Sequence, residues 1–140
     1  MPMALILVAG ATAALAQNSL DVVRLAPGDL DWGEDAGQVT RIEITGDRTM
    51  PGTYAYRVRF PMGFRNEPHF HPDERVVTVI AGTLHVGFGE RFDEAELRAL
   101  PAGSLWTEPS DQPHFVWAKQ GEVIIQVIGF GPSGTTQVKR

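Results

Sequence analysis

Short β-strand segments separated by turn residues run through most of this 140-residue chain, and they restrict its fold more than any other feature. Each segment is rich in β-branched or aromatic residues and is bounded by Gly, Pro, Asp or Asn, which end strands and form turns. Short strands at regular spacing are typical of an all-β barrel or sandwich. The predicted strands are residues 39–44, 54–60, 76–80, 83–88, 104–108, 115–118 and 123–130.

One segment between the strands has a helical pattern. Asp93 is a suitable N-cap for a short helix over residues 93–100, and Pro101 would end it. Ahead of the strands, residues 18–38 form a turn-rich arm that is expected to lie over the outside of the barrel. Because the length fits one domain, we expect a single β-barrel over residues 39–140 with an N-terminal arm and at most one short helix.

Residues 1–17 have the apolar core of a signal peptide and end in the small-residue pattern Ala14-Leu15-Ala16 before Gln17. A buried N-terminal helix is the alternative interpretation. The segment is shorter than the roughly 20 apolar residues of a membrane span. We therefore expect cleavage after Ala16 or Gln17, a periplasmic or other extracytoplasmic location, and no membrane span in the mature protein.

Composition excludes several kinds of site and partner. The chain has no cysteine, so disulfides, thiolate metal sites, iron–sulfur clusters and cysteine nucleophiles are excluded. Its net charge is −5, and lysines and arginines form no run. This charge argues against nucleic acid or an anionic membrane surface as the main partner. Small molecules are the expected ligands.

Two histidines, His69 and His71, are separated by one residue on an extended segment, so their side chains point to the same side. Glu74 follows them, and His114 comes later in a turn-rich segment that leads into another strand. A compact barrel would bring all four side chains together. Neutral imidazoles suit Fe, Mn, Ni, Cu or Zn. We expect one divalent metal ion, which could be Fe, Mn, Ni or Zn. The sequence does not decide among them. The alternative to a metal site is an empty histidine pocket. The fourth histidine, His85, alternates with apolar neighbours and is expected to face outward.

These histidines belong to two motifs that resemble those of small single-domain bacterial cupins, a group with exported members. The first motif is Gly63, His69, His71, Glu74 and Gly82, and the second is Pro109, Asp111 and His114. The resemblance covers nearly everything after the leader and implies a jelly-roll β-barrel. It specifies the activity weakly, because cupin barrels host oxygenases, isomerases, epimerases, lyases, storage proteins and sensors.

The chain departs from the cupin pattern at several positions. Asp111 stands where the family prefers glycine, and Ala118 stands where it usually has asparagine. The family's metal-binding glutamate comes three or four residues after the second histidine, whereas Glu74 follows sooner and Arg75 takes the more usual place. Glu74 becomes a fourth ligand only if a bulge turns it inward. Otherwise it lies on the rim or pairs with a cation, and is then the first general acid or base to test.

Aromatic and polar residues on neighbouring strands are candidates for the lining of a ligand pocket, although aromatic side chains in barrels more often belong to the core or to a dimer interface. The candidates are Tyr56, Phe64, Trp106, Phe115, Trp117 and Gln126.

Three functions are compatible with these features. The first is a mononuclear metalloenzyme that acts on a small organic molecule, as a dioxygenase or in isomerase, lyase or hydrolase chemistry. The second is a non-catalytic extracytoplasmic module that binds a small ligand or a metal. The third is a structural barrel whose site has decayed. Because barrel edges are often covered by a partner or an arm, we also expect a homodimer, with residues 22–35 as a candidate for exchange between the two chains.

Overall fold

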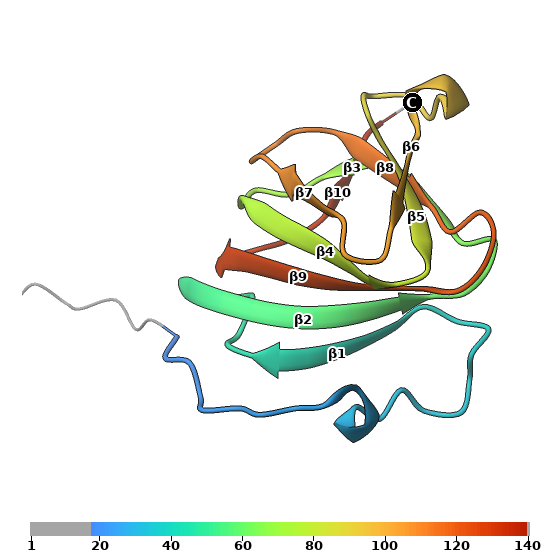
Figure 1. The fold of residues 1–140 in the computed structure, drawn as a ribbon. Coiled ribbons are helices and arrows are strands. Elements are labelled where there is room, and N and C mark those ends of the chain that lie inside the picture. Colours follow the sequence, from blue (N-terminus) through green and yellow to red (C-terminus); the bar gives the residue numbers. More distant parts are fainter. Residues whose placement is uncertain (1–17, 140) are drawn as a thin grey trace, which may run out of the picture.

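The structure, a computed structural model, describes residues 18–139 and contains two facing β-sheets (Figure 1). The predicted signal peptide lies outside the described residues. The first sheet has the order β1-β2-β9-β4-β7 and the second has the order β10-β3-β8-β5-β6. All neighbouring strands are antiparallel. The strands of the first sheet are β1 (Thr40–Thr45), β2 (Gly52–Phe60), β9 (Val123–Gly131), β4 (Arg75–Ala81) and β7 (Leu105–Glu108). Those of the second are β10 (Thr136–Gln137), β3 (Arg65–Phe70), β8 (His114–Trp117), β5 (Thr83–Phe88) and β6 (Arg98–Pro101).

All seven predicted strands are confirmed, with ends that differ by no more than two residues. The strands β3, β6 and β10 were not among them, although the end of β3 was interpreted as extended. The jelly-roll class predicted from the strand pattern and the motifs is confirmed by the two antiparallel sheets.

The predicted helix over residues 93–100 forms only in its first turn. Asp93 is the N-cap as expected, and its carboxylate accepts a hydrogen bond from the backbone N–H of Ala95. The helical part is the 3-10 turn η2 (Glu94–Glu96), and the chain then continues as β6. Pairing of β6 with β5 satisfies the backbone groups of this segment and overrides its local helical preference. A second 3-10 turn, η1 (Pro27–Asp29), lies in the arm.

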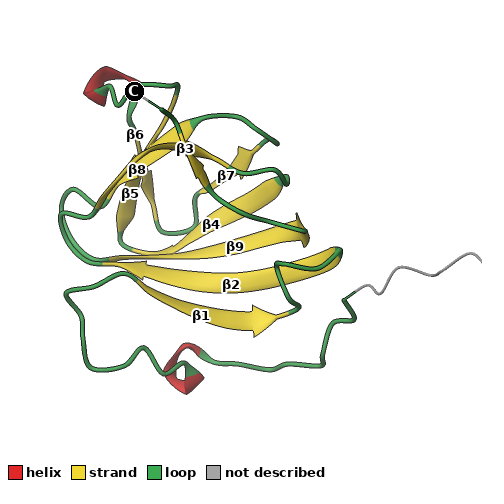
Figure 2. Ribbon diagram, turned by 180° about the vertical axis from the view of Figure 1, so that it is seen from behind, coloured by secondary structure: helices red, strands yellow, loops and turns green. Residues whose placement is uncertain are grey.

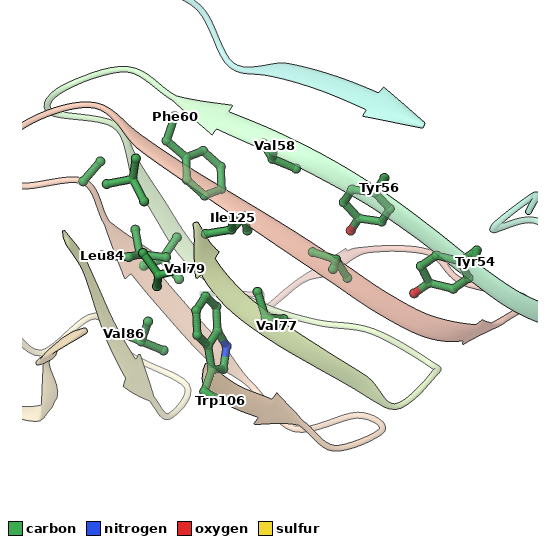
Figure 3. Close-up of a cluster of buried hydrophobic side chains, with 14 residues drawn as sticks. Tyr54, Tyr56, Val58, Phe60, Val77, Val79, Leu84, Val86, Trp106 and Ile125 are labelled. Atoms are coloured by element: carbon green, nitrogen blue, oxygen red, sulfur yellow. The ribbon is translucent and has the colours of Figure 1, made fainter. Parts of the chain in front are cut away.

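The hydrophobic core lies between the two sheets and is built from alternate residues of each strand. In β2, Tyr54, Tyr56 and Val58 point into the core beside Val77 of β4 and Trp106 of β7 (Figure 3). Because successive side chains of a strand point to opposite faces, the inner face of β4 is fixed by Val77. Arg75, at the same parity, is therefore directed inward and is buried, and Asp73, just before the strand, is buried beside it.

The arm runs alongside β1 at the edge of the first sheet (Figure 2). Its two ends are tied to the barrel by polar contacts. Asn18 donates from its backbone N–H to the Pro51 carbonyl at 2.8 Å. Arg59 donates to the Trp32 and Asp35 carbonyls at 3.1 and 2.9 Å. Within residues 18–139, no helix is long and apolar enough to span a membrane.

The two sheets do not close on the β1 side. Arg41 of β1 lies opposite Val58 of β2, so both residues occupy the inner face. Val58 is buried whereas Arg41 is exposed. Glu43, two residues after Arg41 on the same face, is also exposed, so the inner face of β1 is open to solvent.

Candidate metal centre

Three histidines from two adjacent strands meet in the interior. His69 lies in β3 and faces His114 of β8 directly in the strand register, while His71 follows the end of β3. His69 and His71 are each 5% exposed, and His114 is 1% exposed. One ring nitrogen from each lies within 4.8 Å of the other two. The alternation of side chains therefore places His69 and His71 on one face, as the sequence predicted, and strand pairing adds His114.

Each of these histidines has one ring nitrogen held by a backbone carbonyl. Nδ1 of His69 lies 2.8 Å from the Glu67 carbonyl, Nδ1 of His71 lies 2.7 Å from the Gly134 carbonyl, and Nδ1 of His114 lies 3.1 Å from the Gln112 carbonyl. A carbonyl oxygen only accepts, so Nδ1 carries the proton in all three rings. Nε2 is then left with its lone pair, which is the form in which imidazole binds metals.

The surroundings also keep two of the rings neutral. Burial, together with the neighbouring His114, lowers the pKa of His69 to about 4. Burial, together with the Arg75 cation, lowers the pKa of His71 to about 4. Both rings are therefore uncharged at neutral pH and need no deprotonation before they bind a cation.

A turn between β7 and β8 fixes the position of His114 relative to His71. Asp111 in this turn has φ 58°, in the left-handed region that favours glycine, which explains why the related motif prefers glycine there. The Asp111 N–H donates to the His71 carbonyl at 2.8 Å, and the Ser110 hydroxyl donates to the Pro72 carbonyl at 2.6 Å. The two motifs are thereby joined through their backbones.

Glu108, at the end of β7, supplies a carboxylate that the sequence interpretation missed. Its side chain is buried, with Oε1 at 3.1 Å from Nε2 of His114 and Oε2 at 3.7 Å from Nε2 of His71. Oε1 also accepts a hydrogen bond from Trp106 Nε1 at 3.2 Å. Oε2 has no hydrogen-bond partner among the described residues. The available signal was the alternation of β7, in which Glu108 shares the face of Trp106.

The Glu108 carboxylate is ionised. Burial raises its pKa, but the hydrogen bond with His114 and the charge of Arg75 outweigh this effect and hold the pKa below its usual range. Because Gln112 holds the Nδ1 proton, the hydrogen bond from His114 Nε2 to Glu108 requires a second proton on the ring, and in the neutral ring Nε2 is an acceptor opposite this anion. Two acceptors 3.1 Å apart repel unless a proton or another cation lies between them. The donor set and the unpartnered Oε2 atom thus fit a bound cation.

Arg75 provides the positive charge beside this group. It lies 3.4 Å from Asp73 and 3.7 Å from Glu108, and Nη1 donates to the Tyr56 hydroxyl at 3.3 Å. It also donates to the Ser133 hydroxyl and, at 3.4 Å, to the Gly134 carbonyl that holds His71. The position where the related motif usually has a metal-binding glutamate is therefore occupied by a buried cation flanked by two acids.

The structure does not bring Glu74 to the histidines. Its side chain is exposed, whereas its neighbours Asp73 and Arg75 are buried. From Arg75 to Val79, β4 pairs with β9 in continuous register, and Glu74 stands immediately before this stretch with its side chain outward. Glu74 instead lines a shallow hollow on the outer face with Val76 and other residues of β4, β7 and β9.

The histidines lie at one wall of a cavity of about 200 Å³ between the sheets. Of the six expected lining residues, Tyr56, Phe64 and Trp106 line it. The other three do not, because they have the opposite parity to cavity-lining residues on their strands. Phe115 and Trp117 alternate with His114 and Val116 in β8 and pack near Phe92. Gln126 alternates with Ile125 and Val127 in β9 and accepts a hydrogen bond from Arg57. His85 shares the outer side of its sheet with Trp117, its partner in register, as predicted.

The two facing sheets have the fold of solved cupin structures, and the group of three buried histidines lies between them. The chain belongs to the family described as "Domain of unknown function (DUF4437)", whose model matches residues 16–133. No curated protein has significant sequence similarity to the chain.

Solved structures with the same fold have diverse functions. The polyketide cyclase RemF from Streptomyces resistomycificus is 15% identical with a TM-score of 0.66, and the match covers 86% of this chain and 87% of RemF. KdgF from Halomonas sp. is 21% identical with a TM-score of 0.59, covering 79% of this chain and 96% of KdgF. A glycine-to-alanine mutant of salicylate 1,2-dioxygenase from Pseudoaminobacter salicylatoxidans, in complex with gentisate, is 18% identical with a TM-score of 0.59. The match covers 76% of this chain and 30% of the dioxygenase. At these identities the likeness shows the fold alone.

Proposed function

We propose that this protein is a mononuclear metalloenzyme that acts on a small organic molecule. The observation that carries the proposal is the arrangement of three buried histidines with Nδ1 held by carbonyls and Nε2 facing one another. His69, His71 and His114 would hold the ion, and the Glu108 carboxylate would be its fourth protein ligand. When bound, a divalent ion supplies Lewis acidity for polarising an oxygen of the substrate.

The other residues of the site would position the ligands and exclude water. The Glu67, Gln112 and Gly134 carbonyls orient the imidazoles, and such outer partners tune metal affinity. Apolar side chains form part of the cavity wall, and their low polarity strengthens electrostatic interactions in the site. Solved structures with this fold include a dioxygenase and a polyketide cyclase. Both oxygen-dependent and oxygen-independent reactions therefore belong to the substrate screen, and oxygen consumption separates them.

Metal analysis of three proteins tests the proposed ligand set. Wild-type protein, purified without a histidine tag and without added metal, is expected to contain close to one divalent ion per chain. Glu108→Gln is expected to lower metal affinity by at least the roughly 10- to 100-fold seen on loss of outer partners, because a neutral amide replaces a direct anionic ligand. Glu74→Gln is the matched control and is expected to retain wild-type affinity, because Glu74 is exposed.

The measurements are elemental analysis of the purified proteins and competition titration with a chelator. A wild-type protein that is empty and takes up no metal on reconstitution contradicts the metalloenzyme proposal and leaves a ligand-binding or structural barrel. Loss of affinity in Glu74→Gln but not in Glu108→Gln contradicts the assignment of the carboxylate.

We also propose that the protein forms a homodimer through the outer face of the first sheet. Apolar side chains are exposed there on adjacent strands: Val76 of β4 pairs in register with Ile128 of β9, and Phe130 lies two residues further on. A contiguous exposed apolar patch of this kind marks an interaction surface. Light scattering is expected to give the mass of a dimer for wild type and of a monomer for Phe130→Asp. Met62→Asp, at an exposed loop residue, is the control. A monomeric wild type would contradict this proposal.

A further inference from the structure

Most charged residues that line the cavity are cationic. They are three arginines, Arg41, Arg48 and Arg75, and one glutamate, Glu108. The cavity therefore has an excess of two positive charges in a chain whose net charge is −5. A cleft lined by one sign of charge attracts ligands of the opposite sign.

The three arginines differ in how far their charge is already neutralised. Arg75 is buried between Asp73 and Glu108. Arg48 is partly exposed and lies 3.5 Å from Glu43.

Arg41 is different, because its side chain makes no hydrogen bond or ion pair with the described residues. It lies over the ring of Tyr56, with its guanidinium carbon 5.3 Å from the ring centroid. This contact orients a guanidinium but does not neutralise it or occupy its N–H groups. Arg41 is thus the lining cation with all its donors available for a ligand.

Arg41 is also placed where a ligand would enter. It lies on the inner face of β1, at the side where the two sheets do not close, and is exposed there. Val58, Phe60 and Phe64 form an apolar part of the same lining, and the ring centroids of Phe60 and Phe64 are stacked 4.8 Å apart. The same cavity reaches the histidines. Tyr56 contacts both Arg41 and Arg75, and Arg75 lies 3.7 Å from Glu108, so Arg41 is close to the metal-binding part of the lining.

We propose that the cavity binds a small organic carboxylate whose anionic group is held by Arg41 and whose apolar body lies against Val58, Phe60 and Phe64. A guanidinium recognises a carboxylate through two parallel N–H···O hydrogen bonds, which fixes the orientation of the ligand. The molecule then lies in the cavity that the histidines also line. The reaction of such a substrate rests on the proposed function, because it would need the metal ion. Binding of the carboxylate by Arg41 does not require the ion. The cavity volume of about 200 Å³ restricts the ligand to a small molecule.

Matched pairs of ligands test the proposal. Acetate, benzoate and 3-phenylpropanoate are each compared with the corresponding amide by calorimetric titration into zinc-loaded protein at low salt. For at least one pair, wild type is expected to bind the carboxylate about tenfold more tightly than the amide, as a charge-assisted hydrogen bond allows. Arg41→Gln is expected to abolish this preference. Arg98→Gln, which alters an exposed arginine of β6 outside the cavity lining, is expected to keep it.

Two further measurements separate recognition by Arg41 from recognition by the ion. Metal content is determined for every sample, and Arg41→Gln is expected to match wild type. The titrations are repeated on metal-stripped wild type and metal-stripped Arg41→Gln, where the preference is expected to survive only in wild type. A preference that persists in Arg41→Gln, that disappears with the metal, or that no pair shows overturns the proposal. An absence of metal binding with an intact Arg41-dependent preference would instead contradict only the metalloenzyme assignment.

Discussion

Protein carrying His71→Ala is expected to lose metal binding almost completely, with an affinity more than about 100-fold below wild type. This loss exceeds the 10- to 100-fold range for outer partners, because a direct ligand is removed. His71 Nε2 faces the Glu108 carboxylate, and its Nδ1 is held by Gly134. The matched control is His85→Ala, which removes a histidine on the outer side of the second sheet. Chelator competition with Zn²⁺ provides the measurement.

Thermal unfolding provides a second readout in which each variant is compared with itself, so a variant that is less stable does not distort the result. Each protein is melted with and without Zn²⁺, and only the metal-dependent difference is compared. A ligand that binds only the folded state stabilises it by about 4 kcal/mol when it is present at about 1,000 times its dissociation constant. Wild type and His85→Ala are expected to show a metal-dependent rise in Tm, and His71→Ala none. An equal rise in all three would mean that the ion binds elsewhere.

Arg75→Met is expected to lower the free energy of unfolding by about 3–5 kcal/mol, the typical cost of removing one partner from a buried ion pair. The arginine side chain is 5% exposed and lies between Asp73 and Glu108, whose side chains are 3% and 8% exposed. Without the guanidinium, two acids would remain buried together, and Ser133 and Gly134 would lose their donor. Urea unfolding of metal-stripped protein measures the effect.

A charge-removing double variant separates loss of charge compensation from loss of packing. Because Asp73→Asn removes one of the two stranded charges, Asp73→Asn/Arg75→Met is expected to recover part of the stability lost in Arg75→Met. Arg98→Met, at an exposed arginine, is expected to change stability by no more than about 0.5 kcal/mol. A loss below 1 kcal/mol in Arg75→Met would show that Arg75 does not compensate these acids.

The strands and the histidine group could be predicted from sequence because both depend on local periodicity. The spacing of His69 and His71 fixes their shared face wherever the segment is extended. Segment 93–100 was misjudged because its helical composition competes with pairing to β5, which is a tertiary effect. The sequence pointed to Glu74 as the carboxylate near the histidines, whereas the structure places Glu108 there. The reason for this difference is not local composition.

For Glu74 and Glu108, the sequence did not show which face of each strand is internal. Between His71 and Arg75 the chain makes a turn, so parity cannot be carried from the histidines to Glu74. In β7 both faces begin with an apolar residue, Leu105 on one and Trp106 on the other, so local hydrophobicity does not choose between them. The structure buries Trp106 and with it Glu108, and leaves Leu105 exposed.

The mutual neutralisation of Arg75 and Glu108 also limits the paths by which such a site can change over generations. Glutamate at position 75 alone would crowd a third acid against Asp73 and Glu108. A neutral residue at position 108 alone would remove the carboxylate that lies beside His71 and His114. Each single substitution at position 75 or 108 is thus expected either to destabilise the protein or to remove the buried carboxylate. The two positions are therefore expected to tolerate substitution only when they change together.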